Sequence, residues 1–306
     1  MEYLWIVAAL IAAALQTIRS AYQKKMIPFL GEYGATYIRF FYALPFTVLI
    51  FLIWFYFLEN NIPNPSLRAI FYCIIGAGFQ VAFTLSLMII FSFRNFAAGI
   101  AFSKTEVLFA ALVEIFILNI FFLPSVNIGI ILGVFAVIFL SVAKETSSFH
   151  DIFKKICSSF FSIGTCLGLL TGFILAGSTL GYRMAIISID SSILDATILL
   201  STIAIIIQTL IFGIWLFIFK KPQLLLVIQY WKDSLPAGLS GSGATAGWFI
   251  AFALASVAEV RAVGQIELIF SILISIVIFK EKIKKTELLG IIILGLSIFV
   301  VIFSKI

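Results

Sequence analysis

The sequence predicts an all-α integral membrane protein of ten transmembrane helices, arranged as two inverted five-helix repeats. The first observation behind this prediction is composition. Of 306 residues, 63% are hydrophobic and 11% are charged, with a mean hydropathy of +1.21, whereas about a quarter of the residues in an average soluble domain are charged. The second observation is segment length, because a membrane-spanning helix needs about 20 mostly apolar residues. Ten segments qualify, at residues 3–23, 35–58, 69–91, 97–120, 126–143, 158–182, 194–219, 235–256, 260–279 and 287–304.

The third observation is an internal repeat at an offset of 161 residues. The segment LIFLIW at residues 49–54 recurs as LIFGIW at residues 210–215, and AFSKTEVLF at 101–109 aligns with AVGQIELIF at 262–270. Several matches on one diagonal indicate a duplication. Each repeat holds five spans, an odd number, so the second must enter the membrane in the opposite orientation. The expected regions are a first repeat, a polar linker and a second repeat, at residues 1–143, 144–157 and 158–306.

The fourth predicted span carries three ionisable residues, Lys104, Glu106 and Glu114. Ionisable side chains at membrane depth are costly, so they usually face a protein interior or a water-filled cavity. At 100° per residue, Glu106 and Glu114 fall on one face of the helix. The duplication places Glu267 opposite Glu106. We therefore expect Glu106, Glu114 and Glu267 to line a central cavity.

Polar residues at helical spacing mark further candidates for the cavity in other spans. Gln16 and Arg19 belong to a polar stripe in the first span, Arg39 lies one turn inside the second, and Gln80 lies in the third. The two arginines could instead extend toward the headgroups, and Gln80 could join neighbouring helices. Trp248 follows three glycines and lies deep in the eighth span, which favours a stacking surface over an interfacial position. The predicted substrate-binding set is Gln16, Arg19, Arg39, Gln80, Glu106, Glu114, Trp248 and Glu267.

Several functional classes find no support in the sequence. The single histidine, His150, lies in the linker, and no metal-ligand spacing, nucleophile elbow or phosphate loop is present. We therefore predict no catalytic residues, no metal and no cofactor. The net charge of +6 comes from lysines and arginines in short loops without interleaved aromatic residues, which is typical of contact with anionic headgroups and not of nucleic-acid binding.

The chain resembles the EamA-type members of the drug/metabolite transporter superfamily. The motif of that family is Glu-Pro followed by a small-apolar helix and then Gly-Glu-Arg/Lys. In this chain leucine replaces the proline and Phe-Lys replaces the usual Leu-Gly. Here Glu267-Leu268 leads to Phe279-Lys280-Glu281-Lys282, and Glu106-Val107 fits in the first repeat, where Ile120 stands at the position of Glu281. The resemblance implies a basket of helices around a central cavity, in a bacterial inner (plasma) membrane.

The predicted function is secondary active transport of a small polar or zwitterionic metabolite, such as an amino acid or related amine, by alternating access. Since desolvation disfavours the charged form of a carboxyl group, Glu106 and Glu267 are candidates for proton coupling. The alternatives are that the protein is an exchanger, and that Glu106 simply caps or bonds a neighbouring helix. The alternatives are an intramembrane enzyme and an exporter of drugs or hydrophobic cations. The expected partners are the small-molecule substrate and the lipid bilayer, with the chain as a monomer or a homodimer.

Loop charges predict the orientation in the membrane. Thirteen lysines and arginines fall in the loops that follow odd-numbered spans, and the opposite side has Arg68, Arg183, Arg261 and Lys305. By the positive-inside rule, both termini are expected to face outward.

Overall fold

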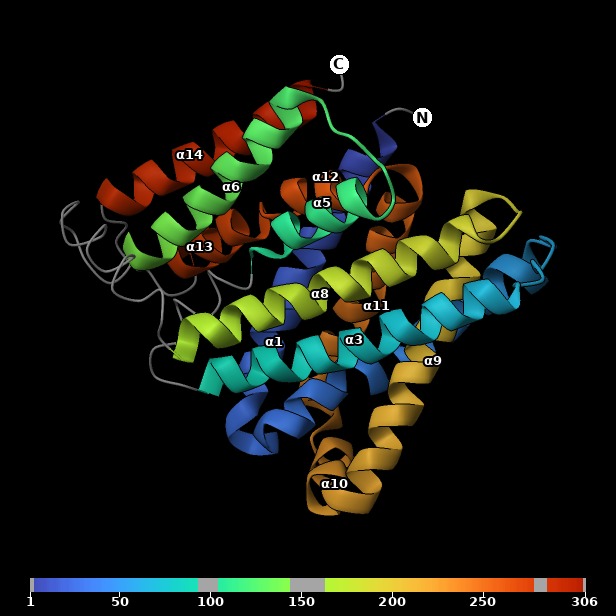
Figure 1. Ribbon diagram of the computed structural model, residues 1–306. Helices are drawn as coiled ribbons and strands as arrows, with labels where there is room; N and C mark the ends of the chain where they lie inside the picture. Colours follow the sequence, from blue (N-terminus) through green and yellow to red (C-terminus); the bar gives the residue numbers. More distant parts are fainter. Residues whose placement is uncertain (1–2, 93–103, 144–162, 278–284, 305–306) are drawn as a thin grey trace. The chain divides into compact units, whose positions relative to one another are not determined.

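The computed structural model describes residues 3–92, 104–143, 163–277 and 285–304 (Figure 1). Every regular element in these ranges is a helix. Five helical stretches are long and apolar enough to cross a membrane: 4–57, 67–90, 166–187, 193–219 and 231–254. Shorter apolar helices cover 124–139 and 288–303. The chain is therefore an all-helical integral membrane protein, as its composition predicts.

Helix α1 (Leu4–Phe41) contains a sharp break at Gly31, where φ is +66°. Glycine adopts this conformation without steric cost because it lacks a Cβ atom, and an added Cβ would lie 2.6 Å from Nε2 of Gln223. The chain then continues through α2 (Leu44–Leu52) and a π-helical turn, Ile53–Phe57. The sequence predicts two spans joined by a loop over residues 24–34; instead, the first helix extends through Pro28 to the break.

The first compact unit combines Met1–Ser92 with Gly177–Ala255. It contains α1, α2, α3 (Leu67–Ser92), the C-terminal half of α8 (Ile163–Ile187), α9 (Ile193–Phe219), α10 (Lys221–Gln229) and α11 (Trp231–Leu254). Small residues let α11 approach α1 closely. A Cβ atom added at Gly247 would lie 2.9 Å from the Cβ atom of Ala12, and a Cβ atom added at Gly238 would lie 2.3 Å from the backbone carbonyl carbon of Tyr42. Such contacts are typical of helix packing in membranes.

The second compact unit combines Phe93–Ala176 with Ser256–Ile306. Its complete helices are α5 (Glu106–Phe116), α6 (Pro124–Ala143), α12 (Val257–Gly264), α13 (Glu267–Val277) and α14 (Lys285–Phe303). Helices α6 and α14 pack along each other, and Oγ of Ser297 donates a hydrogen bond to the carbonyl of Gly129 at 2.8 Å. Each compact unit thus draws on both halves of the sequence. The predicted linker, 144–157, and the motif around Glu281 lie outside the described residues.

Both predicted spans that carry the aligned glutamates differ from the single long helices expected. A turn at Lys104–Thr105 precedes α5, which begins at Glu106, and a turn at Gln265–Ile266 separates α12 from α13, which begins at Glu267. Helices α5 and α13 are both 11 residues long and start at positions that the repeat relates. The two helices therefore begin 161 residues apart, at the offset on which the predicted duplication rests.

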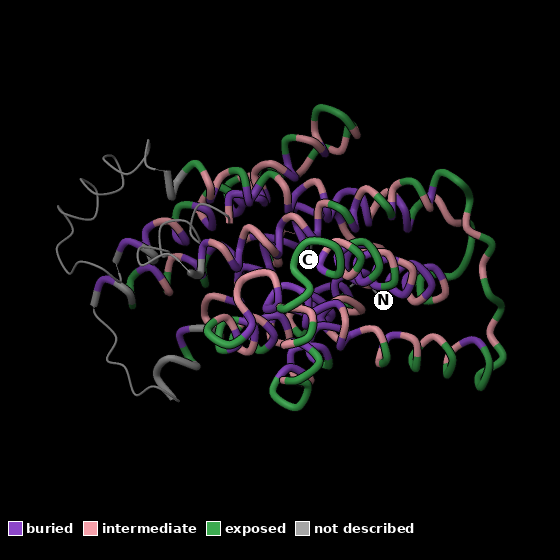
Figure 2. Tube along the Cα trace, turned by 90° about the horizontal axis from the view of Figure 1, so that it is seen from below, coloured by how far each residue is buried: buried purple, intermediate pink, exposed green. Residues whose placement is uncertain are grey.

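Burial follows the helical period within each unit. In Figure 2 the helices alternate between buried and exposed residues along their length, as helices do when one face packs on neighbours and the other is open. The open faces are apolar: on α9, for example, Leu210, Ile214 and Phe217 are exposed. Such faces suit lipid, and they leave the buried polar side chains as the candidates for function.

Candidate functional site

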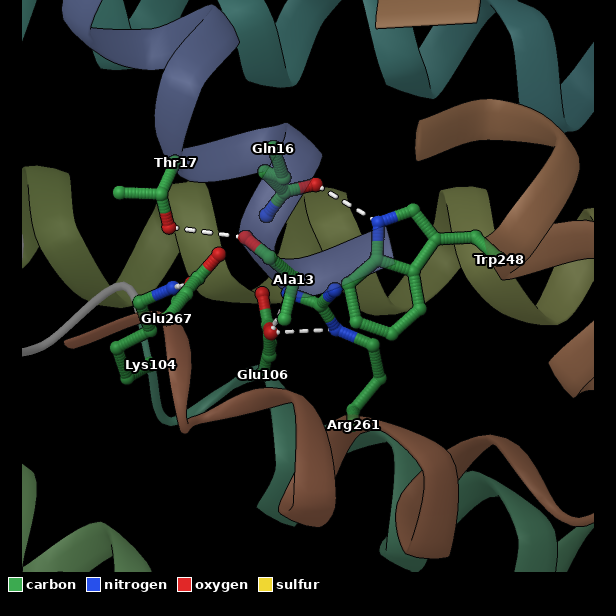
Figure 3. Close-up of polar contacts among 8 residues, drawn as sticks. All are labelled: Ala13, Gln16, Thr17, Lys104, Glu106, Trp248, Arg261 and Glu267. Carbon is green, nitrogen blue, oxygen red and sulfur yellow. Dashed lines mark hydrogen bonds and ion pairs between the residues drawn. The ribbon is translucent and has the colours of Figure 1, made fainter. Parts of the chain in front are cut away.

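Two crossed ion pairs lie at the starts of α5 and α13 in the second unit (Figure 3). Nε of Arg261 donates to Oε1 of Glu106 at 2.7 Å, and Nη2 of Arg261 donates to the same oxygen. Nζ of Lys104 pairs with Oε1 of Glu267. Arg261 and Glu106 are only 3% and 2% exposed. Each glutamate is thus neutralised by a cation from the other repeat.

The local sequence places these groups by starting and stopping helices. Ser256 caps α12, where its Oγ accepts a hydrogen bond from the backbone N–H of Glu259 at 3.3 Å. Glu106 and Glu267 each occupy the first turn of a helix, where a carboxylate interacts favourably with the helix dipole. The two pairs therefore lie where helical segments meet, as substrate sites do in transporters with discontinuous helices.

Glu114 has a clear structural role at the start of α12. Its Oε1 accepts from the backbone N–H of Val257 at 2.8 Å, and its Oε2 accepts from that of Ala258 at 3.0 Å. These are two of the N–H groups that a helix leaves without intrahelical partners. Both oxygens of Glu114 are engaged, so this side chain fixes α12, and with it Arg261, against α5.

One carboxylate oxygen of the Arg261–Glu106 pair has no hydrogen-bond partner. Both donors of Arg261 reach Oε1 of Glu106, while the buried Oε2 of Glu106 has no hydrogen-bond partner. A buried acceptor without a partner costs about 1–3 kcal/mol, and more when it is charged. This oxygen can accept a hydrogen bond from a group, such as an ammonium, that enters the site.

In the first unit, Gln16 and Trp248 lie together, as Figure 3 shows. Nε1 of Trp248 donates to Oε1 of Gln16 at 2.9 Å, and the indole stacks on Phe252 with ring centroids 5.9 Å apart. Arg19 is also buried, and a Cβ at Gly241 would lie 3.4 Å from its Cδ atom. The glycines before Trp248 thus make room for an arginine of α1.

Arg39 and Gln80 belong to a buried polar group in the same unit. Nη1 of Arg39 donates to Oγ1 of Thr84 at 2.7 Å, and Oγ of Ser178 donates to Oε1 of Gln80 at 3.1 Å. Sequence reasoning missed Ser178, because a serine in an apolar span has no distinctive signal. All eight predicted substrate-binding residues are buried; five of them lie in the first unit and three in the second.

Two arginines that the sequence assigns to loops lie within helices instead. Arg261 is buried in α12. Nη1 of Arg183 in α8 donates to the carbonyl of Phe252 at 2.8 Å and to that of Ala255, at the C-terminal end of α11. Neither arginine belongs in the count of loop charges on the side opposite the thirteen lysines and arginines. Without them, the excess of positive charge in the loops after odd-numbered spans is larger than the sequence predicts. The sequence feature that could have marked Arg261 as a site residue is its position six residues before Glu267.

In the described part of the chain, no three His, Cys, Asp or Glu side chains come together in a way that could hold a metal ion. The ionisable groups found there are instead arranged as opposed charges inside a membrane protein. Such an arrangement can bind a charged solute or hold a proton.

Comparison with known proteins gives a family and a fold. Comparison with curated proteins finds no match. Among solved structures, 28 chains match; one, titled "Crystal structure of protein", is 12% identical with a TM-score of 0.67, covering 98% of this chain and 94% of that chain. This likeness shows the fold alone. Residues 162–303, which include Arg261 and Glu267, match the EamA-like transporter family, whose members are transporters and not enzymes. Over residues 162–303 the chain is therefore similar to the EamA-like transporter family.

Proposed function

We propose that the protein is a secondary active transporter of a small polar or zwitterionic metabolite, an amino acid or a related amine, working by alternating access. The observation that carries this proposal is the pair of crossed, buried ion pairs at the two helix breaks, Arg261–Glu106 and Lys104–Glu267. Ionisable residues inside the membrane mark substrate and ion pathways. The transporter domain supplies the functional class.

The charges of the site favour a zwitterionic substrate. Removing one partner of a buried ion pair costs about 3–5 kcal/mol, because the other charge stays uncompensated. A solute with both a carboxylate and an ammonium group avoids this cost: the carboxylate takes the place of Glu106 on Arg261 while the ammonium binds the released glutamate. Arg261 suits this role because its planar guanidinium matches a carboxylate with two parallel hydrogen bonds.

The first unit, taken by itself, carries the other residues proposed for substrate binding. The indole of Trp248 offers an aromatic face, and Gln16, Arg19, Arg39 and Gln80 offer donors and acceptors for polar groups. Glu114 contributes through its hold on α12.

The same site offers a route for coupling to protons. When a substrate carboxylate engages Arg261, Glu106 loses its neutralising partner, and a buried carboxylate without one is disfavoured relative to its protonated form. Proton uptake by Glu106, or by Glu267 after release from Lys104, would link substrate movement to the proton gradient. Exchange of one substrate for another would restore the pair without a proton.

The proposal includes the architecture that the duplication implies: ten spans in two inverted repeats, as a monomer or homodimer in a bacterial inner membrane. The starts of α5 and α13, at Glu106 and Glu267, support the duplication.

Transport by reconstituted protein tests the function. The purified chain is first screened by thermal shift against amino acids, their decarboxylated amines and their methyl esters. Compounds that stabilise it are then tested for saturable, concentrative uptake into proteoliposomes with and without a pH gradient. We expect amino acids to stabilise more than either derivative. Accumulation of hydrophobic cations, with no response to any zwitterion, would refute the proposed substrate class in favour of a drug exporter.

A further inference from the structure

A short helix, α10, lies at one end of the first unit, between the end of α9 and the start of α11 (Figure 1). Its inner face is fixed to α1: Val227 is buried, a Cβ at Gly34 would lie 3.5 Å from its Cγ2 atom, and the hydroxyl of Tyr42 donates to its carbonyl at 2.8 Å. Its outer face is apolar, with Leu225 57% and Ile228 53% exposed. The helix is thus firmly held with an open apolar side.

Three lysines frame this helix, and each lies over an aromatic ring. Nζ of Lys220 is 5.4 Å from the ring centroid of Tyr33, that of Lys221 is 5.5 Å from Phe217, and that of Lys232 is 5.6 Å from Trp231. In the part of the chain that the structure describes, no carboxylate lies within 4 Å of any of these three ammonium groups. Their positive charges are therefore available to an anion from outside.

The two ends of the first unit differ in charge. Phe29 packs on Tyr230 with centroids 5.6 Å apart, which brings the end of the first segment of α1, with exposed Lys24 and Lys25, to the α10 end. The described acidic residues at that end are Glu32 and Asp233. At the other end, Trp54 donates to Asp195 at 2.7 Å and Ser66 donates to the carbonyl of Ser188. There the charged residues described are Glu59, Arg68, Arg183, Asp190 and Asp195.

We propose that α10, together with Lys220, Lys221, Lys232 and Trp231, is a binding surface for the headgroups of anionic phospholipids. A helix with an exposed apolar face and flanking lysines lies in the membrane interface, with its apolar side at the boundary of headgroups and acyl chains. Trp231 is placed as an interfacial tryptophan is, and the lysines bind lipid phosphates.

Continuity with the lipid-facing surface favours lipid over a protein partner. The last turn of α9, which leads into α10, exposes Phe217, Ile218 and Phe219, and such residues at the end of a spanning helix belong in the bilayer. The apolar surface of α10 therefore begins where the bilayer-facing surface of α9 ends. Because anionic lipids are enriched in the cytoplasmic leaflet, the surface also assigns the α10 end of this unit to the cytoplasm.

Lipid titration of the purified, full-length protein tests the proposal. Thermal unfolding is followed in nanodiscs of phosphatidylcholine alone and of an equal mixture with phosphatidylglycerol, and native mass spectrometry gives the apparent affinity for phosphatidylglycerol. Each interfacial lysine should contribute about fivefold to this affinity. The triple variant Lys220→Gln/Lys221→Gln/Lys232→Gln should lose on the order of a hundredfold, together with the stabilisation by phosphatidylglycerol. Arg68→Gln is the matched control, because Arg68 lies over Tyr72 at 5.6 Å at the opposite end of the unit.

Two outcomes would overturn the proposal: a triple variant that retains the phosphatidylglycerol effect, or an Arg68→Gln variant that loses as much of it. If the triple variant does not fold, the wild-type protein still decides the question. Its stabilisation by phosphatidylglycerol should fall as salt rises, since exposed charges are screened, and brominated lipid should quench the fluorescence that Trp231→Phe removes. An effect independent of salt, or the absence of quenching, would contradict the assignment.

Discussion

Arg261 and Glu106 are separated by 155 residues in the sequence, yet Nε of the arginine lies 2.7 Å from Oε1 of the glutamate inside the protein. The pair joins α12 of the second repeat to the first residue of α5 in the first. The Lys104–Glu267 pair joins the repeats in the opposite sense. The two breaks are therefore held together by charge as well as by packing.

Removing the charge of Glu106 should destabilise the protein. Glu106→Gln takes from the buried Arg261 the carboxylate that its Nε and Nη2 contact. The expected loss is about 3–5 kcal/mol, measured as a drop in the thermal unfolding midpoint in detergent. Arg261→Gln in the same background also removes the buried positive charge and should recover part of the loss. Equal midpoints for wild type and Glu106→Gln would show that the ion pair contributes nothing to stability.

Proton coupling should depend on the same glutamates. Glu106→Gln preserves shape while removing titration, so it should abolish accumulation driven by a pH gradient. Counterflow exchange should persist at a lower substrate affinity, because an amide binds an ammonium group less strongly than a carboxylate does. Glu267→Gln tests the aligned position in the same way. Gradient-driven uptake by both variants at wild-type rates would eliminate coupling through this pair.

Arg19 should distinguish recognition of an anionic group from simple burial. Arg19→Lys keeps the charge but loses the planar fork of donors, so substrate affinity should fall, and Arg19→Ala should reduce it further. The thermal-shift midpoint against substrate concentration measures both effects. Wild-type affinity in both variants would leave Arg19 with a packing role against Gly241.

Labelling of introduced cysteines should report the orientation of the first unit. In a background without Cys73, Cys157 and Cys166, a cysteine at Gln229 in α10 should be shielded from an impermeant maleimide in intact cells, and one at Asn61 should react. Ser148→Cys, in the predicted linker, should be shielded as Gln229→Cys is. The reverse pattern would place the basic end outside the cell.

Two glycines allow a matched test of helix packing. Gly238→Ala places a Cβ 2.3 Å from the backbone of Tyr42, which backbone movement alone can relieve, so we expect a loss of about 1–3 kcal/mol. Gly78→Ala meets nothing within 4 Å and should be neutral or stabilising by up to about 1 kcal/mol. Similar thermal midpoints for the two variants would contradict the close approach of α11 to α1.

Apolar segments were sufficient to predict the helical membrane fold, because lipid requires each spanning segment to satisfy its own backbone hydrogen bonds. Hydropathy is insensitive to where a helix stops within an apolar run, so the breaks before Glu106 and Glu267 were missed. The continuation of α1 to Gly31 was missed for the opposite reason, since Lys24 and Lys25 make a helical segment look like a loop. The repeat alignment did place Glu106 and Glu267 at equivalent positions, and each is the first residue of a helix.

The partners of the predicted site residues could not be read from the sequence. Glu114 and Glu106 look alike on a helical wheel, yet the first holds backbone N–H groups of α12 and the second holds Arg261. The difference arises from tertiary contacts between segments more than 140 residues apart. Arg261 escaped notice because it lies near the edge of an apolar segment, where arginines commonly end in a loop.

The crossed ion pairs also set an order of events during synthesis. A lysine or arginine at the centre of an isolated spanning helix costs about 2.5–3.5 kcal/mol on insertion, and Glu106 leaves the ribosome 155 residues before Arg261. At about 5–20 residues per second, that interval is on the order of ten to thirty seconds. Until the second half of the chain has been made, Lys104 and Glu106 lack the partners that Glu267 and Arg261 provide in the folded protein.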